Sequence, residues 1–219
     1  MIRAVLFDRD DTLSVMDAAK YPQAAAWAQQ QFGVDAGMVL RVMHQHWQRA
    51  FGEWWDLRTL DDERAFWTKY SRGLAADLSL SDGQGEAFLA KFPYQVFMKA
   101  APQARAVLEA LRERGLKIGV LSNTLPNIWP TLDAIGLADL VDVALSSCAL
   151  GVHKPALEVF RLAASELGVA CGEVLFLDDK PENVVAAREV GMRAELVDLS
   201  GEVAGALVGL WEVVGLLDG

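Results

Sequence analysis

The candidate catalytic residues begin with an acidic run that starts at Asp8 and ends at Thr12, directly after the apolar residues 2–7. Asp8 and Asp10 stand two positions apart, so both can face one pocket if the chain turns as it leaves a strand. One carboxylate can then attack while the other manages protons. A solvated acidic loop fits the run equally well, whereas a calcium loop would need a glycine and a distal glutamate that this spacing lacks.

Two further polar groups follow later apolar runs. Ser122 and Asn123 come after residues 116–121, where a hydroxyl and free backbone N–H groups can hold a phosphate oxygen or cap the next helix. Lys154 precedes Pro155, which fits the first position of a helix, and a lysine at a helix N-terminus attracts anions. An exposed surface lysine is the alternative interpretation.

The fourth group ends the apolar run 174–177. Asp178 and Asp179 are adjacent there, and Asn183 follows one helical turn later. Oxygen ligands of this kind suit Mg²⁺. A helix cap built from Asp179 is the alternative.

Repeated strand–helix units would position these groups. Apolar runs predict strands at 2–7, 116–121, 141–145, 174–177 and 194–197. Helices that begin near proline and end at glycine are predicted at 102–115, 127–136, 155–168 and 181–191. The alternation predicts an α/β fold with a doubly wound parallel sheet, which binds ligands at the carboxyl ends of its strands.

Residues 17–95 interrupt this alternation with a pattern that is helical throughout. They predict an all-helical insertion between two parts of one core, residues 1–16 and 96–219. The insertion holds five of the seven tryptophans (Trp27, Trp47, Trp54, Trp55 and Trp67). Trp54 and Trp55 are consecutive, so one helix face cannot bury both, and we expect one to be partly exposed. Such rings more often pack in a core than contact a substrate.

Together and in this order, the four groups resemble the haloacid dehalogenase-like (HAD-like) hydrolase superfamily: D-x-D-x-T, then Ser or Thr, then Lys, then D-D-x-x-x-N. The resemblance covers the whole chain, because the helical insertion matches the C1-type cap that many members carry. Asp10 indicates the phosphatase branch. Dehalogenases expel a halide, which needs no proton, and lack this acid.

The resemblance implies that Asp8 is the nucleophile and a Mg²⁺ ligand. Asp10 would give its backbone carbonyl to the metal, while its side chain acts as general acid and base. We expect burial or acidic neighbours to raise the pKa of Asp10, because the acid must be protonated when the leaving group departs. Arg9 is expected to turn away from the nucleophile and is given no catalytic role.

The other motif residues receive supporting roles from the same resemblance. Thr12 and Ser122 would position the nucleophile and the phosphoryl group, and Asn123 would also bind phosphate. Lys154 would offset charge between the nucleophile and the phosphoryl oxygens. The metal site would be completed by Asp179 as the principal ligand, by Asp178 as either a nearby ligand or a group that holds the ligands in place, and by Asn183 as a support for the loop.

The function implied is Mg²⁺-dependent hydrolysis of a small phosphorylated metabolite, with sugar phosphates among the candidates, through a phosphoryl-aspartate. A phosphomutase shares the first half-reaction. A catalytically silent binding protein would keep the same fold. Both alternatives stay open from the residues alone.

The amino-acid composition limits the classes of partner that the protein can be expected to bind. The net charge is −10 and no Lys/Arg-rich run is present, so neither nucleic acid nor a membrane surface is expected as a partner. The longest apolar stretch, 203–217, is interrupted by glycines and predicts a packed terminal helix. Cys148 and Cys171 are expected to be reduced, and the protein to be a cytoplasmic monomer or homodimer.

Overall fold

A five-stranded parallel sheet forms the centre of the fold in the computed structural model, which describes residues 1–217. The strand order is β5-β4-β1-β6-β7. The strands are β1 (Ala4–Phe7), β4 (Lys117–Ser122), β5 (Val143–Ser146), β6 (Val174–Asp178) and β7 (Arg193–Leu196). β1 and β6 are buried along their whole length, because helices cover both faces of a parallel sheet.

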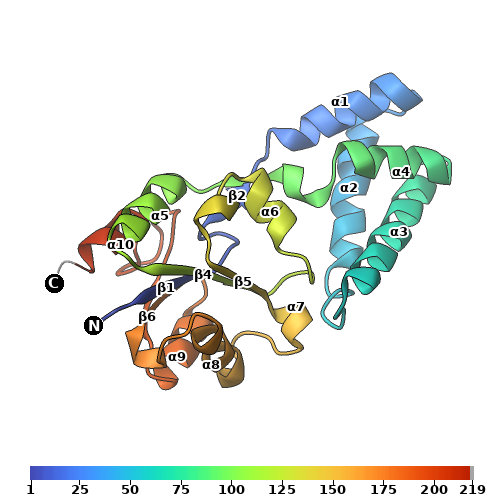
Figure 1. The fold of residues 1–219 in the computed structure, drawn as a ribbon. Coiled ribbons are helices and arrows are strands. Elements are labelled where there is room, and N and C mark those ends of the chain that lie inside the picture. The colour runs from blue at the N-terminus through green and yellow to red at the C-terminus, as the bar shows by residue number, and fades with distance from the viewer. Residues whose placement is uncertain (218–219) are drawn as a thin grey trace.

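Helices form a layer on each face of the sheet (Figure 1). One layer holds α5 (Ala104–Glu113), α6 (Trp129–Ala134) and α10 (Glu212–Gly215), and the other holds α8 (Leu157–Glu166) and α9 (Pro181–Glu189). Side chains of β1 alternate between the layers: Val5 and Phe7 join one apolar cluster and Leu6 joins the other. The predicted doubly wound α/β fold is confirmed. The shorter helical segments are η2 (Ala138–Leu140), α7 (Ser147–Leu150) and η3 (Cys171–Glu173).

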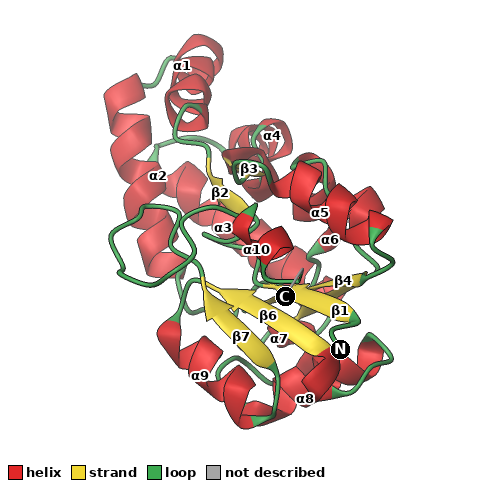
Figure 2. Ribbon diagram, turned by 90° about the vertical axis from the view of Figure 1, so that its left-hand side faces the viewer, coloured by secondary structure: helices red, strands yellow, loops and turns green. Residues whose placement is uncertain are grey.

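A second group of helices stands beside the sheet (Figure 1). It consists of α1 (Lys20–Phe32), α2 (Ala36–Ala50), α3 (Leu60–Asp77), α4 (Asp82–Lys91) and the 3₁₀ turn η1 (Tyr94–Phe97). Thr59 and Ser81 begin α3 and α4 with capping boxes, which satisfy free N–H groups at each helix start. An antiparallel ribbon of β2 (Ser14–Met16) and β3 (Met98–Ala100), which the sequence did not predict, joins this group to the core (Figure 2).

Two predicted helices differ in the structure. α8 begins at Leu157 rather than Pro155, and the peptide between Lys154 and Pro155 is cis. Lys154 therefore lies in a loop before the helix. The stretch 203–217 is helical only at Glu212–Gly215, and Gly205 adopts a φ of 83°, which favours a turn over a continuing helix.

Candidate active site

The parallel register brings the predicted site residues to one edge of the sheet. β4 and β6 both pair with β1 in parallel, so their carboxyl ends lie together. Asp8 follows β1, Ser122 ends β4 and Asp178 ends β6. The backbone N–H of Asp8 also donates to the carbonyl of Leu177 at 2.7 Å, which fixes the start of the acidic loop.

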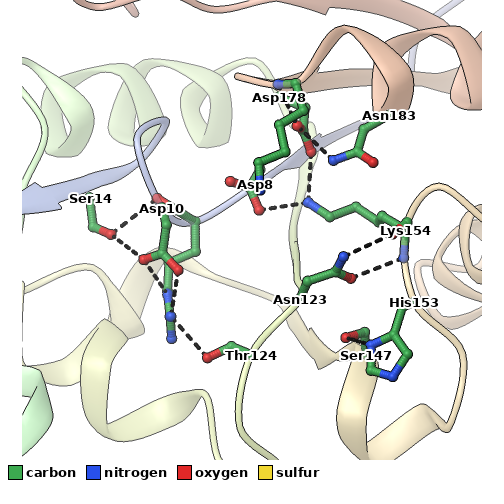
Figure 3. Close-up of polar contacts among 12 residues, drawn as sticks. Asp8, Asp10, Ser14, Asn123, Thr124, Ser147, His153, Lys154, Asp178 and Asn183 are labelled. Atoms are coloured by element: carbon green, nitrogen blue, oxygen red, sulfur yellow. Dashed lines mark hydrogen bonds and ion pairs between the residues drawn. The ribbon is translucent and has the colours of Figure 1, made fainter. Parts of the chain in front are cut away.

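Lys154 lies between two of these carboxylates (Figure 3). Its Nζ donates to Oδ1 of Asp8 and to Oδ2 of Asp178, each at 2.6 Å. The lysine side chain is only 2% exposed. Burial acts to lower the pKa of Lys154, but the two carboxylates outweigh it and raise that pKa. The structure thus keeps a buried positive charge beside Asp8.

Asn123 fixes the loop that carries this lysine. Its side-chain amide donates to the carbonyl of Lys154 and accepts from the N–H of Lys154, both at 2.9 Å. His153, which the sequence reasoning did not single out, is tied on both sides of its ring. Nδ1 lies 2.6 Å from Oγ of Ser147, and Nε2 lies 3.0 Å from the carbonyl of Trp55. The loop before α8 is therefore held by the core and by the helical insertion.

Three carboxylates form an acidic cluster next to Lys154. Asp8, Asp178 and Asp179 each present an oxygen, and these oxygens lie within 4.8 Å of one another. Burial, opposed by the charge of Lys154 and reinforced by Asp178, raises the pKa of Asp8 to about 7. Burial and then Asp178 raise the pKa of Asp179 to about 6. The raised pKa values show that burial and mutual repulsion outweigh the charge of Lys154, and three clustered carboxylates supply the oxygen ligands that a hard cation such as Mg²⁺ prefers.

Two hydrogen bonds orient Asp178 within this cluster. The backbone N–H of Lys180 and the side-chain amide of Asn183 both donate to Oδ1 of Asp178, at 2.9 Å. Asn183 is buried in the first turn of α9. Oδ2 is left to face Lys154 and the cluster.

The side chain of Asp10 lies apart from this cluster and pairs with Arg9. Nε and Nη2 of Arg9 donate to the two carboxylate oxygens of Asp10 at 2.9 and 2.7 Å. Nη2 also contacts Oγ1 of Thr124 at 2.9 Å and the hydroxyl of Tyr94 at 3.2 Å. Arg9 is 1% exposed. Ser14 Oγ adds a hydrogen bond to Asp10 at 3.2 Å.

This pairing overturns the prediction of a raised pKa for Asp10. Burial acts to raise it, but the charge and hydrogen bonds of Arg9, helped by Ser14, outweigh burial and lower the pKa of Asp10. Arg9 does turn away from Asp8, as expected. It is nevertheless part of the site, because a two-point contact fixes the orientation of Asp10.

Most of the motif residues surround a small hollow, which we call the polar pocket. Its volume is about 70 Å³, and its lining includes Asp8, Asp10, Ser122, Lys154 and Asp179. Ser122 is 1% exposed. Thr12 is fully buried, and its hydroxyl has no hydrogen-bond partner among the described residues. Thr12 is absent from the pocket lining, whereas Asn123 and Asn183 are part of it.

The consecutive residues Trp54 and Trp55 differ in burial, as expected. Trp54 is buried and stacks on Trp47 with ring centroids 5.2 Å apart, whereas Trp55 is half-buried and packs edge-on against His153. Trp55 thus faces the loop of Lys154.

The fold and the site define an α/β protein with a buried lysine and an acidic cluster at the carboxyl edge of its sheet, where such sheets bind ligands. Comparison with known proteins gives the family. The model of haloacid dehalogenase-like hydrolases matches residues 2–191, and the chain belongs to that family. The predicted family is confirmed.

Individual relatives and solved structures are consistent with this family. The chain is 35% identical to "Phosphatase MT3486" of Mycobacterium tuberculosis (strain CDC 1551 / Oshkosh) over all of this chain and 98% of that protein. A HAD phosphatase from Thermococcus onnurineus superposes with a TM-score of 0.65 at 24% identity, covering 100% and 99% of the two chains. A HAD family enzyme of Bacteroides thetaiotaomicron, in complex with magnesium and inorganic phosphate, gives 0.61 at 18% identity, covering 93% and 98%. These two similarities show the fold.

No helix among residues 1–217 is both long enough and apolar enough to cross a membrane.

Proposed function

We propose that this protein hydrolyses a small phosphorylated metabolite with Mg²⁺, through a phosphoryl group carried on Asp8. The protein is a phosphoric monoester hydrolase of the HAD-like family; the proposal concerns its cofactor, its mechanism and its substrate. One observation carries it: Asp8 lines a small pocket, accepts a hydrogen bond from a buried lysine and clusters with two further carboxylates.

Asp8, Asp178 and Asp179 would hold the Mg²⁺ ion, with the backbone carbonyl of Asp10 as an additional ligand. Their clustered oxygens and the raised pKa values of Asp8 and Asp179 fit such a cation. When bound, the ion neutralises negative charge on the carboxylates and on the phosphate.

In the first step, a carboxylate oxygen of Asp8 attacks phosphorus, and the bond from phosphorus to the ester oxygen breaks. Lys154 donates to Asp8 and remains charged, so it reduces the repulsion between two anions. Ser122 offers its hydroxyl in the same pocket to a phosphoryl oxygen, and Asn123 keeps Lys154 in place. Thr12 would support the acidic loop from beneath.

Asp10 transfers the protons. It gives one to the departing ester oxygen, and it then takes one from the water that releases inorganic phosphate and restores Asp8. The lowered pKa of Asp10 in the free protein has to be overcome for the first transfer. A phosphate dianion bound beside Asp10 does this, because added negative charge raises the pKa of a neighbouring carboxyl.

Residues 17–95 would serve as a C1-type cap over a catalytic core of residues 1–16 and 96–219. The contacts of Arg9 with Tyr94, and of His153 with Trp55, join the two parts next to the site. Closure of such a cap would exclude water while the phosphoryl group is transferred.

The proposal also covers the type of substrate, the cellular location and the oligomeric state of the enzyme. The net charge of −10 favours a small-molecule substrate over nucleic acid or an anionic membrane. We propose a cytoplasmic monomer or homodimer.

Phosphate release measures the function directly. The wild-type protein should release inorganic phosphate from p-nitrophenyl phosphate with Mg²⁺ and not with EDTA, and Asp8→Asn should lose several orders of magnitude in rate. A phosphomutase would instead yield an isomerised sugar phosphate without net phosphate. A silent binding protein would release none, and turnover of Asp8→Asn within about tenfold of wild type would refute the nucleophile.

A further inference from the structure

A second hollow, which we call the apolar pocket, adjoins the polar pocket. Its volume is about 190 Å³, and Asp10 and Asp11 line both hollows. The rest of its lining comes from the helical insertion and the β2–β3 ribbon, including Met43, Trp47 and Phe88. Because the two hollows share walls, one ligand can place a phosphate in the polar pocket and its remaining part in the apolar pocket.

The lining of the apolar pocket is mostly apolar. Thirteen of its fifteen residues are aliphatic or aromatic, and the other two are Asp10 and Asp11 at the junction. Away from Asp10 and Asp11, the side chains of the walls offer a polar ligand three tyrosine hydroxyls (Tyr21, Tyr70 and Tyr94) and the indole N–H of Trp47. Tyr94 already accepts from Arg9, and the indole N–H of Trp67 already donates to Glu63. Among the described residues of this lining there is no Lys, Arg, His, Asn or Gln.

These walls disfavour polar substrates. A ligand carboxylate would have no cation within the pocket and would face Asp10 and Asp11 at the junction. A sugar ring would bury several hydroxyls for which the walls supply few partners, and each unpaired one costs binding energy.

Two other hollows lie near the site, and neither is placed to hold the leaving group. One of about 280 Å³, at residues 197–203, shares Asp11 and Asp179 with the polar pocket but not Asp10. One of about 450 Å³ is lined by Arg9 and Glu63 and shares no lining residue with the polar pocket. An ester oxygen protonated by Asp10 must lie beside Asp10, so its alcohol portion extends into the apolar pocket.

We infer that the substrate is the phosphate ester of an apolar, uncharged alcohol, whose aliphatic or aromatic body fills the apolar pocket. This inference rests on the proposed function, because it uses Asp10 as the acid. A volume of about 190 Å³ equals about six water molecules at ~30 Å³ each, so the body has roughly six to nine non-hydrogen atoms. It replaces the sugar phosphates that the sequence suggested.

Aromatic walls can also bind a quaternary ammonium ion. Aliphatic side chains such as Met43, Leu74 and Leu89 share the lining with the rings here, and the two carboxylates lie at the junction with the polar pocket. The walls therefore supply hydrocarbon contact away from the phosphate, and charge only beside it. We assign the pocket to a neutral body, and the experiment below distinguishes a neutral body from a quaternary ammonium ion.

The test compares kcat/KM of the 219-residue protein with Mg²⁺ on a matched set of phosphate esters. 3,3-Dimethylbutyl phosphate and phosphocholine have the same shape and differ in one positive charge. Glucose 6-phosphate and phosphoserine represent polar bodies, and acetyl phosphate lacks a body that fills the pocket. We expect 3,3-dimethylbutyl phosphate to exceed phosphocholine, glucose 6-phosphate and phosphoserine by at least about tenfold, which is the worth of a poorly matched polar group.

A series of n-alkyl phosphates supplies a second measure. Each added methylene should raise kcat/KM by about fourfold until the pocket is filled. A flat series, or phosphocholine, glucose 6-phosphate or phosphoserine as the best substrate, would overturn the inference while leaving the proposed function intact. Absence of Mg²⁺-dependent turnover on every ester, acetyl phosphate included, would overturn the proposed function and the inference with it.

Leucine variants test whether the preference for an apolar substrate arises in the apolar pocket. Leu89 of α4 is half-buried and lines both the apolar pocket and the hollow of about 450 Å³, whereas Leu60 of α3 is 56% exposed and lines neither. Met98 lines the apolar pocket but not the larger hollow. Leu89→Gln should lower the ratio of kcat/KM for 3,3-dimethylbutyl phosphate to that for acetyl phosphate by about tenfold. Leu60→Gln should keep the ratio within about twofold, and Leu89→Met should largely preserve it. A ratio unchanged in both Leu89→Gln and Met98→Gln, which alters another wall, would refute the assignment.

Discussion

Replacing Lys154 by methionine tests the electrostatic core of the site. The substitution keeps an unbranched side chain but removes the cation that donates to both Asp8 and Asp178 at 2.6 Å. The side chains involved are 2%, 8% and 0% exposed for Lys154, Asp8 and Asp178, so solvent cannot screen the charges left behind. Removing one partner of such a buried pair costs about 3–5 kcal/mol in the free energy of unfolding.

The loss in the free energy of unfolding caused by Lys154→Met should depend on pH and on Mg²⁺. Asp8 has a pKa of about 7 in the wild-type protein, where Lys154 acts to lower it. At pH 8 the lysine therefore stabilises an ionised Asp8, whereas at pH 6 Asp8 is mostly protonated and gains little from the lysine. The destabilisation in EDTA should therefore be about 3 kcal/mol or more at pH 8 and smaller at pH 6. Mg²⁺ at a hundred times its dissociation constant should stabilise the variant by about 2.7 kcal/mol, because it binds only the folded cluster.

Urea unfolding followed by tryptophan fluorescence measures these differences. Lys180→Met is the matched control, since Lys180 is exposed at the rim of the same pocket and its loss should cost less than about 1 kcal/mol. A loss below about 1 kcal/mol for Lys154→Met at pH 8, or an equal loss in the control, would refute the account of Lys154.

Three further outcomes follow from the same geometry. Asp10→Asn should slow turnover of alkyl phosphates by roughly 10²–10⁴, and its first step should suffer less on aryl phosphates in single-turnover measurements; equal losses would contradict the acid role. Arg9→Lys replaces the two-point contact with Asp10 by a single one, so kcat should fall by about tenfold with little change in KM, and an unchanged kcat would show that Arg9 does not position Asp10. Mg²⁺ should bind more tightly at pH 8 than at pH 6 in calorimetric titrations, because Asp8 and Asp179, with pKa values of about 7 and 6, must lose their protons; affinity that does not change with pH would exclude them as ligands.

The sequence predicted well those parts of the site that follow from strand ends. Asp8, Ser122 and Asp178 each end a short apolar run, and parallel strands place their carboxyl ends at one edge. Their proximity therefore follows from local pattern and general topology. Lys154 was also placed at this edge, although its loop and not a helix end presents it.

The contacts of Arg9 could not be predicted in the same way. Alternation along the strand gives the direction of the side chain, but not the partners it meets there. Thr124 is 115 positions away and Tyr94 is 85 positions away, and only the assembled core and insertion bring them together. The lowered pKa of Asp10 comes mainly from its neighbour Arg9, whose side chain folds back onto both oxygens of Asp10, and the motif alone suggested the opposite direction. The apolar pocket also depends on long-range contacts, because four helices and a ribbon each supply part of its wall.

The central claim is that Asp8 carries the phosphoryl group, and mass spectrometry of the trapped enzyme tests it most directly. Asp10→Asn should slow hydrolysis of the intermediate, so this variant, mixed with Mg²⁺ and p-nitrophenyl phosphate and quenched in acid, should accumulate it. The account predicts that the peptide containing Asp8 gains the mass of one phosphoryl group, and that the Asp8→Asn protein gains none. Sustained phosphate release with no phosphoryl group on that peptide, or with the group on another residue such as Ser122 or His153, would contradict it.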